Sequence, residues 1–281
     1  MSKNGKSGPP PIPPPVISAQ LTAGEMKELF YAKSLLENPG FTARIANMLG
    51  TPIEKGFKLL PRNWSDVVSK ASKAALTKAL QLAVATLGAR KPIKSSERFH
   101  KILVGASGGI GGVFGLAALP IELPLSTTIM LRSIADIARS EGHSLSTVQT
   151  RLSCLEVFAL GGRSSRDDAT ESSYWAVRMA LATAVSEAAS YLAQKTVVEE
   201  SAPVVLRLVT AIAARFGVVV SEQTAAKAVP LVGAAGGAVV NVLFMNHFQD
   251  MARGHFIVRR LELKYGTELV RQMYESIAIP Y

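Results

Sequence analysis

The chain has 281 residues, of which 48% are hydrophobic, and its formal net charge is +10. This length and apolar content suffice for a sizeable core, so we expect one domain behind a short tail. A single cysteine, Cys154, excludes a disulfide framework within the chain and favours a reducing compartment. The first residues are polar and proline-rich, unlike a secretory signal, so we expect the protein on the cytoplasmic side.

The N-terminal segment is dominated by proline and reads MSKNGKSGPPPIPPP. Repeated prolines remove backbone donors and fix φ, so this segment forms neither helix nor sheet. We expect residues 1–20 to be a disordered tail, a spacer rather than a ligand for a proline-binding domain. Residues 21–281 are then predicted to be a single helical domain.

The first predicted helices have clear start and stop signals. Thr22 precedes Glu25 by three residues, as in a capping box, and the Asn-Pro-Gly sequence at 38–40 ends that helix. A short helix is predicted over residues 41–49. A longer one, rich in alanine, leucine and lysine, is predicted over residues 65–87.

Residues 54–101 carry most of the excess positive charge, with eleven lysines or arginines against three acidic residues. A segment of this kind suits an anionic membrane surface or a nucleic acid, and the plain alternative is a solvated basic helix face. It lacks interleaved aromatic residues and any helix-turn-helix or zinc signature, so we expect no specific nucleic-acid partner.

Two uncharged, glycine-rich stretches follow, at residues 102–121 and 228–246. Glycine inside a helix costs about 1 kcal/mol relative to alanine, and close backbone approach between helices would offset that cost. We therefore expect two apolar helices that pack in the core or against membrane, with self-association through them as a further possibility. The glycines expected at helix contacts are Gly105, Gly108, Gly112, Gly115, Gly233, Gly236 and Gly237. Neither a P-loop nor a complete dinucleotide-binding pattern is present, so no cofactor is predicted.

Prolines shape the middle of the chain. Pro120 and Pro124 flank Glu122 and predict a sharp corner, after which a helix begins at residue 125 and ends near residue 140. Further helices are predicted over residues 147–160, 171–195, 203–216, 231–255 and 259–274. Strand signals are nearly absent, so the predicted fold class is all-α, a compact multi-helix bundle.

Three long segments resemble the EcsC family of bacteria. They are GASGGIGGVFGLAALPIELPLSTTIMLRSIADIARSEG at residues 105–142, CLEVFALGG at residues 154–162 and NHFQDMARGHFIVRRLELKYG at residues 246–266. The resemblance extends over most of the chain from about residue 38. The family is named after a protein encoded beside an ABC-type transporter, so the resemblance implies a membrane-linked accessory role. It supplies no catalytic residues.

Four charged residues are weak candidates for an acid and base cluster. Glu122 lies at the end of an uncharged run, where a carboxylate is costly unless it is paired or hydrated. It is interpreted as a proton or ion site, as a contact to a partner or, more simply, as a capping group for the helix after it. Arg132 and Asp136 are spaced for an i, i+4 pair. Glu156 lies among apolar residues on its own helix face, so we expect it to be at least half buried. Its first candidate partners are Arg132 and Arg163, and a structural ion pair is favoured over a catalytic acid.

His247, Asp250 and His255 are weak candidates for a metal site. Their spacing is not the i, i+4 pair of helical zinc sites, so ordinary polar roles are favoured and no metal is predicted. Cys154 shares a helix face with Val157 and Phe158, which favours a core residue over a nucleophile.

These observations favour a membrane-linked accessory protein that binds anionic lipid or a membrane protein such as an ABC-type transporter. We expect it at the cytoplasmic side of the inner membrane, peripheral rather than inserted. In the inserted alternative residues 102–119 form a re-entrant segment that turns at residues 120–124, because too few apolar residues follow for a second span. A membrane-surface enzyme that uses Glu122, Arg132, Asp136 and Glu156 remains the second hypothesis.

Overall fold

The computed structural model describes residues 20–37, 41–50, 53–87, 118–162, 173–195, 198–229 and 233–278. Within these ranges the regular structure is entirely helical, which confirms the all-α prediction. The helices are α1 (Ala23–Glu37), α2 (Phe41–Leu49), α3 (Glu54–Lys58), α4 (Trp64–Thr86), α6 (Leu119–Ser140), α7 (Val148–Leu160), α8 (Ser173–Ala193), α9 (Pro203–Ala228), α10 (Gly233–Tyr265) and α11 (Thr267–Ser276). The proline-rich tail lies outside the described residues.

The predicted helix starts are confirmed where a side chain caps the helix. The backbone N–H of Thr22 donates to Glu25 Oε2 at 2.9 Å, and the N–H of Glu25 donates to Thr22 Oγ1 at 3.3 Å. At the start of α7, Thr147 Oγ1 accepts from the N–H of Thr150 at 3.2 Å. In each case the side chain satisfies a backbone group that the first helical turn leaves without a partner.

The predicted corner at the two prolines is wrong. Both Pro120 and Pro124 lie inside α6, which begins at Leu119 rather than at residue 125. The first turn of a helix has no acceptor for its N–H groups, so Pro120 costs it nothing. Pro124 has no N–H, so α6 lacks one backbone hydrogen bond at this position. The Pro124 carbonyl accepts a hydrogen bond from the Thr128 hydroxyl at 2.8 Å.

The last helices are longer than predicted. Helix α9 continues past residue 216 through Gly217 to Ala228, because Val219 and Val220 are fully buried. Helix α10 continues past residue 255 to Tyr265, so the two predicted C-terminal helices overlap one observed helix. Gly266 ends α10 with φ of +84°, and its N–H donates to the Glu262 carbonyl at 2.8 Å.

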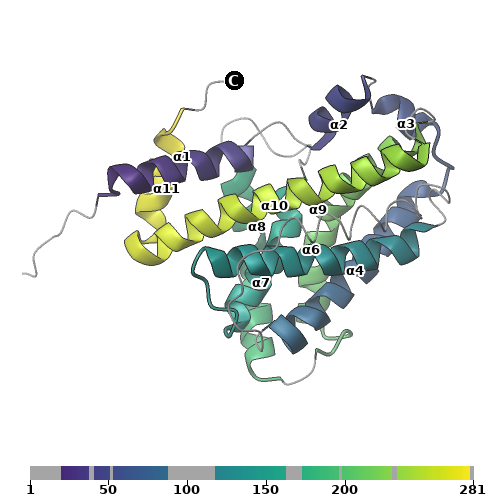
Figure 1. Cartoon of the computed structure of the whole chain (residues 1–281). Coiled ribbons are helices and arrows are strands. Elements are labelled where there is room, and N and C mark those ends of the chain that lie inside the picture. The colour runs from purple at the N-terminus through teal and green to yellow at the C-terminus, as the bar shows by residue number, and fades with distance from the viewer. Residues whose placement is uncertain are drawn as a thin grey trace, which may run out of the picture.

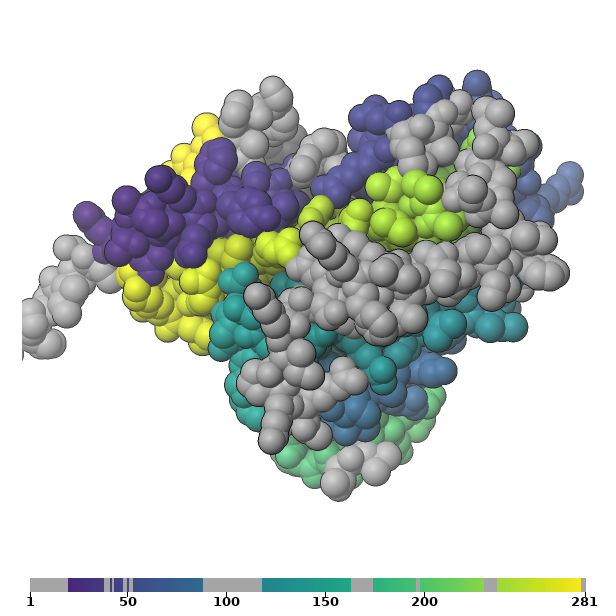
Figure 2. Space-filling view, viewed as in Figure 1, coloured from purple at the N-terminus to yellow at the C-terminus, as the bar shows by residue number. Residues whose placement is uncertain are grey.

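Helix α10 is the longest element and spans the molecule (Figure 1). It packs against α1 and α11 at its C-terminal part, and against α6, α7, α9 and α2 elsewhere. In the space-filling view α1 (purple) lies directly on the C-terminal part of α10 (yellow) (Figure 2). Helix α4 packs on both α6 and α9, which closes the other side of the bundle.

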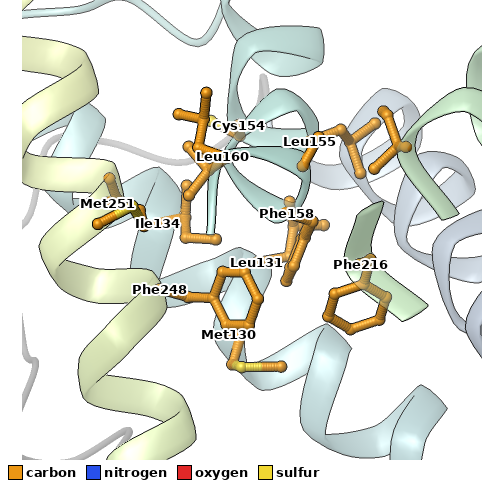
Figure 3. Packing of buried hydrophobic residues seen from close by; sticks show 14 of the residues in the cluster. Met130, Leu131, Ile134, Cys154, Leu155, Phe158, Leu160, Phe216, Phe248 and Met251 are labelled. Atoms are coloured by element: carbon orange, nitrogen blue, oxygen red, sulfur yellow. The ribbon is translucent and has the colours of Figure 1, made fainter. Parts of the chain in front are cut away.

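Four phenylalanine rings occupy the centre, where α7, α9 and α10 meet. Phe158, Phe216, Phe244 and Phe248 are fully buried, and the Phe158 ring centroid lies 5.2 Å from Phe216 and 5.3 Å from Phe248. These tilted and edge-to-face contacts add to the burial of the rings. Cys154 is buried in the same core, as predicted (Figure 3).

One close helix contact at a glycine involves a residue that was not among the predicted ones, and the predicted glycines stay a prediction. Gly105, Gly108, Gly112 and Gly115 lie outside the described residues, Gly233 and Gly236 fall in the first turn of α10, and Gly237 is buried. At Gly254, a Cβ would lie 2.7 Å from Leu36 Cγ and 2.9 Å from the Ala32 carbonyl oxygen. Gly254 therefore permits the close packing of α1 on α10.

Candidate functional site

One end of the molecule is assembled around the last turn of α9 (Figure 1, right-hand side). A Cβ on Gly56 would lie 2.1 Å from the carbonyl oxygen of Ala225, so the backbones of α3 and α9 approach too closely for any other residue. Two residues further along α9, Lys227 Nζ donates to Glu122 Oε1 of α6 at 2.5 Å. The same oxygen accepts from Asn241 Nδ2 of α10 at 2.9 Å. We call this part of the molecule the α9 end.

Glu122 is the junction of the α9 end, and its carboxylate is almost completely buried. It lies in the first turn of α6, as suits an acid, but it does not cap a helix that starts at residue 125. Gln223 Nε2 donates to Asn241 Oδ1 at 2.8 Å and so extends the hydrogen-bonded chain. Burial lowers the pKa of Lys227, and the Glu122 carboxylate opposes that effect. The junction therefore fixes α6, α9 and α10 relative to one another.

Apolar side chains project from the elements that meet at the α9 end. Leu59, directly after α3, is 54% exposed, and Ile121 and Leu125 of α6 are 80% and 52% exposed. The rings of Phe57 and Trp64 make a tilted contact, with centroids 5.4 Å apart, and both side chains are partly exposed. Single exposed leucines are ordinary on protein surfaces, so their meaning depends on what surrounds them.

Basic side chains surround α3 and continue along α4. Lys55, Lys58 and Arg62 are exposed, and so are three lysines of α4. These last are Lys70, Lys73 and Lys78. No ion pair is formed by any of the six within the part of the chain that the structure describes. The rest of the predicted basic segment, from residue 88 to residue 101, lies outside that part.

A second polar feature is buried between α7, α8 and α10. We call it the buried polar cluster, and its members are Glu156, Tyr174, Arg178, His255, Arg259 and Glu262.

Glu156 of this cluster is 5% exposed, which confirms its predicted burial. Of the two predicted partners of Glu156, Arg132 is wrong because it is exposed to solvent, and Arg163 lies outside the described residues. Instead Arg259 Nη1 faces Glu156 Oε2 at 4.0 Å, and that oxygen accepts no hydrogen bond from any described residue. Burial raises the pKa of Glu156, and the positive charge of Arg259 opposes the rise.

The other members of the cluster form a hydrogen-bonded chain. Arg178 binds Glu262 through two bonds of 2.7 and 3.0 Å, and Arg178 Nη1 also donates to the Tyr174 hydroxyl at 3.3 Å. Because an arginine only donates, the Tyr174 hydroxyl is left to donate to His255 Nδ1, 3.1 Å away. His255 then carries its proton on Nε2, which has no acceptor among the described residues. Burial holds the pKa of His255 well below its usual value.

The four candidate acid and base residues do not converge. Glu122 binds Lys227 at the α9 end, whereas Glu156 faces Arg259 in the buried polar cluster. The expected pair of Arg132 and Asp136 is replaced by a buried pair in which Arg139 Nη1 lies 2.9 Å from Asp136 Oδ1. Arg139 faces α4, where its Nη2 also donates to the Leu87 carbonyl at 3.0 Å, while Arg132 faces solvent.

The three candidate metal ligands also face different partners. His247 Nε2 lies 3.2 Å from the Gly161 carbonyl oxygen, Asp250 pairs with Arg44 at 2.7 Å, and His255 Nδ1 binds Tyr174. No group of three histidine, cysteine or acidic side chains that could hold a metal ion occurs within the described ranges.

Sequence reasoning missed Lys227, Arg178 and Glu262. Arg178 and Lys227 have mostly apolar neighbours along their helices, and a charge in that position is a signal of a buried partner. Glu262 lies among basic residues of α10 and carries no such signal. The partner itself carries no local signal, because Arg178 and Glu262 are 84 positions apart.

The profile of the EcsC protein family matches residues 25–261. The chain belongs to the EcsC family. This match covers most of the described helices, including the α9 end and every member of the buried polar cluster except Glu262, and leaves α11 outside. No curated protein and no solved structure matches this EcsC-family chain.

Among the described helices of this EcsC protein, α9 alone is long and apolar enough to cross a membrane. Of its most apolar 18 residues, 44% are buried in the fold. A core helix has the same length and composition, so α9 by itself is weak evidence for a span.

Proposed function

We propose that this EcsC-family protein is a membrane-linked accessory protein that attaches peripherally to an anionic membrane surface through the exposed basic residues of α3 and α4. The supporting observation is that six exposed lysines and arginines on these neighbouring elements make no ion pair within the described residues. Glu54 and Asp66 are the acidic residues interspersed among them. The surface thus keeps a net positive charge.

The size of the effect fits attachment by several weak contacts. Each basic residue near an anionic bilayer contributes about 1 kcal/mol, so six together exceed the affinity needed for reversible binding. Such binding weakens as salt is added, because exposed charges are screened beyond about 8 Å at physiological ionic strength. The membrane in question is the cytoplasmic face of the inner membrane. The further proposal that the protein assists or regulates an ABC-type transporter or secretion rests on its membership of the family.

Cosedimentation with lipid vesicles tests the attachment. The full chain is mixed with vesicles of phosphatidylcholine alone or with added phosphatidylglycerol, at about 0.1 M and about 0.5 M salt. We expect binding only to the anionic vesicles and only at the lower salt. Lys58→Glu combined with Arg62→Glu should weaken it at least about tenfold.

The matched control is Lys27→Glu combined with Lys195→Glu, which changes the net charge equally at exposed positions on α1 and after α8. If both double variants lose binding equally, net charge rather than the α3 and α4 surface is responsible. Equal binding to neutral and anionic vesicles would also contradict the proposal.

Fractionation of native cells separates peripheral attachment from insertion. A peripheral protein leaves the membrane pellet in a high-salt wash. Resistance to both salt and alkaline carbonate would instead support the alternative in which residues 102–119 are embedded, a segment outside the described residues.

A further inference from the structure

Several of the exposed apolar side chains in this protein belong to the elements that meet at the α9 end. Leu59, Ile121, Leu125 and Val239 come from the end of α3 and from the N-terminal parts of α6 and α10. The basic residues nearest in sequence to Leu59 are Lys55, Lys58 and Arg62, all exposed. Apolar and basic groups therefore occur together at the end of α3, and the α6 residues come from a helix that is held to the same last turn of α9.

We propose that the α9 end inserts its apolar side chains into the interfacial layer of an anionic bilayer, with Leu59, Ile121 and Leu125 as the inserted residues. Lys55, Lys58 and Arg62 then lie at the level of the lipid phosphates. This inference rests on the proposed attachment to an anionic membrane and specifies which end of the protein meets the lipid.

The direction of these side chains follows from helix geometry. Ile121 and Leu125 are four residues apart, so they project from the same face of α6, one turn from each other. Glu122, which lies between them in sequence, points inward to Lys227 and Asn241. The buried carboxylate thus orients α6 so that the apolar pair faces outward.

Rigidity makes the arrangement suited to insertion. The backbone of α3 is held against Ala225 at Gly56, and the Glu122 junction holds α6 and α10 against the same turn of α9. A bilayer that contacts Leu59 and the α6 pair together meets a preformed surface and orders few groups on binding, which favours affinity.

The chemistry of the α9 end fits a lipid surface. Basic side chains beside exposed leucine and isoleucine match the two layers of a bilayer interface, with phosphates outside and acyl chains beneath. Trp64 contacts Phe57 of α3, and tryptophan is enriched at membrane–water interfaces.

The two tryptophans of the chain allow a direct test. Trp64 contacts Phe57 of α3, whereas Trp175 of α8 is buried against Arg178 of the buried polar cluster. In a Trp175→Phe variant, the emission of Trp64 should be quenched by phosphatidylglycerol vesicles whose acyl chains carry bromine near the head group. In a Trp64→Phe variant, the emission of Trp175 should be unchanged by the same vesicles.

A pair of double variants measures the contribution of the apolar side chains. Ile121→Gln with Leu125→Gln should weaken vesicle binding about tenfold or more, with unchanged thermal unfolding because both side chains are exposed. The matched control is Met179→Gln with Leu206→Gln, which replaces two apolar residues that are also more than half exposed, on α8 and near the start of α9. This control should bind like the wild type.

The outcomes separate the two proposals. Binding to anionic vesicles without quenching of Trp64, and with the Ile121 and Leu125 variant equal to wild type, would overturn insertion and leave electrostatic attachment standing. Absence of binding to any vesicle would overturn both. Attachment to native membranes but to no lipid vesicle would overturn the choice of lipid as the partner and indicate a membrane protein.

Discussion

Glu156 and Glu262 are two buried glutamates of the buried polar cluster. Replacing each of them is expected to have the opposite effect on stability. Glu262 is held by two hydrogen bonds from Arg178, whereas Glu156 Oε2 accepts none from the described residues. Burial of a carboxylate whose oxygen lacks a hydrogen bond disfavours its charged form, and a buried pair is disrupted by loss of either member. The effect of replacing each glutamate by glutamine follows from this difference.

We predict that Glu156→Gln stabilises the protein at pH 8 and leaves its stability unchanged at pH 4. The pKa of Glu156 is raised in the folded state, so its stabilising, protonated form is present at low pH and is lost as pH rises through the folded pKa. Glutamine removes that loss. Thermal unfolding of the variant and the wild type at pH 8 and pH 4 measures the difference in stability. A variant less stable than the wild type at pH 8 would show that Arg259 compensates the charge of Glu156 fully.

Glu262→Gln is the matched comparison in the same cluster. It leaves the buried Arg178 guanidinium without its charged partner, so we expect a loss of about 3 kcal/mol in the free energy of unfolding at neutral pH. Denaturant unfolding of both variants gives the values. An equal effect of the two substitutions would refute the distinction between them.

His247 affects how the stability of the protein changes at acid pH. Burial lowers its pKa from the usual value near 6.5 to about 4. A histidine whose pKa is lowered by folding contributes stability above pH 6.5, and that contribution is lost as the pH falls towards 4. The lowered pKa of His247 corresponds to at most about 3 kcal/mol in the free energy of unfolding. His247→Asn should reduce the difference in unfolding free energy between pH 7 and pH 5. An unchanged difference would place the acid sensitivity in other groups.

At the scale of the element, glycines inside helices have two different roles. A Cβ at Gly254 would collide with Leu36 and with the Ala32 carbonyl oxygen, whereas at Gly217 the nearest contact would be Ser72 Oγ at 3.8 Å. We predict that Gly254→Ala destabilises the protein by about 1 to 3 kcal/mol, by separating α1 from α10. Gly217→Ala should stabilise it by about 0.5 to 1 kcal/mol, since alanine is the better helix former.

Denaturant unfolding of the two glycine variants provides the measurement. Opposite signs are expected from the same chemical change in two neighbouring helices of the bundle. Two losses of similar size would mean that α9 requires Gly217 for a reason other than space.

Helix starts that carry a side-chain cap could be predicted from the sequence, whereas the start of α6 and several helix ends could not. A capping box at Thr22 and a capping threonine at Thr147 act through side chains only three residues away, so local sequence determines them. Whether a helix continues through Gly217 or Gly254 depends on burial against α4 and α1. That burial comes from residues distant in the sequence.

The same division holds for the candidate site. The apolar neighbours of Glu156 indicated its burial, because they share its helix face, but Arg259 lies more than a hundred positions away. The basic character of α3 and α4 follows from composition alone. The meeting of α3, α6 and α10 at the α9 end follows from the Gly56 and Glu122 contacts. The position of Glu122 after an uncharged run singles it out in the sequence, but nothing local identifies Lys227 and Asn241 as its partners.

At the scale of the whole molecule, the C-terminal helix closes the fold although it lies beyond the family match. Tyr274 of α11 is fully buried against Tyr174 and Trp175, and Lys33 Nζ of α1 donates to the Tyr274 carbonyl at 2.8 Å. We predict that Tyr274→Ala lowers the free energy of unfolding by about 3 to 5 kcal/mol. The emission of Trp175 should shift to longer wavelength as water reaches it.

The control for this prediction is Tyr31→Ala, which removes an equally large but exposed ring from α1. It should change stability by less than about 0.5 kcal/mol. A Tyr274→Ala variant that unfolds like wild type would show that α11 is dispensable for the EcsC fold.

The α9 end draws its contacts from Gly56, Glu122, Lys227 and Asn241, positions spread over most of the chain. A ribosome delivers these residues in order, so the Glu122 junction cannot close until Asn241 has left the exit tunnel. A growing chain therefore exposes its lysines long before the surface that orients Ile121 and Leu125 exists. We expect the released, finished protein, and not the nascent chain, to be the species that recognises its membrane.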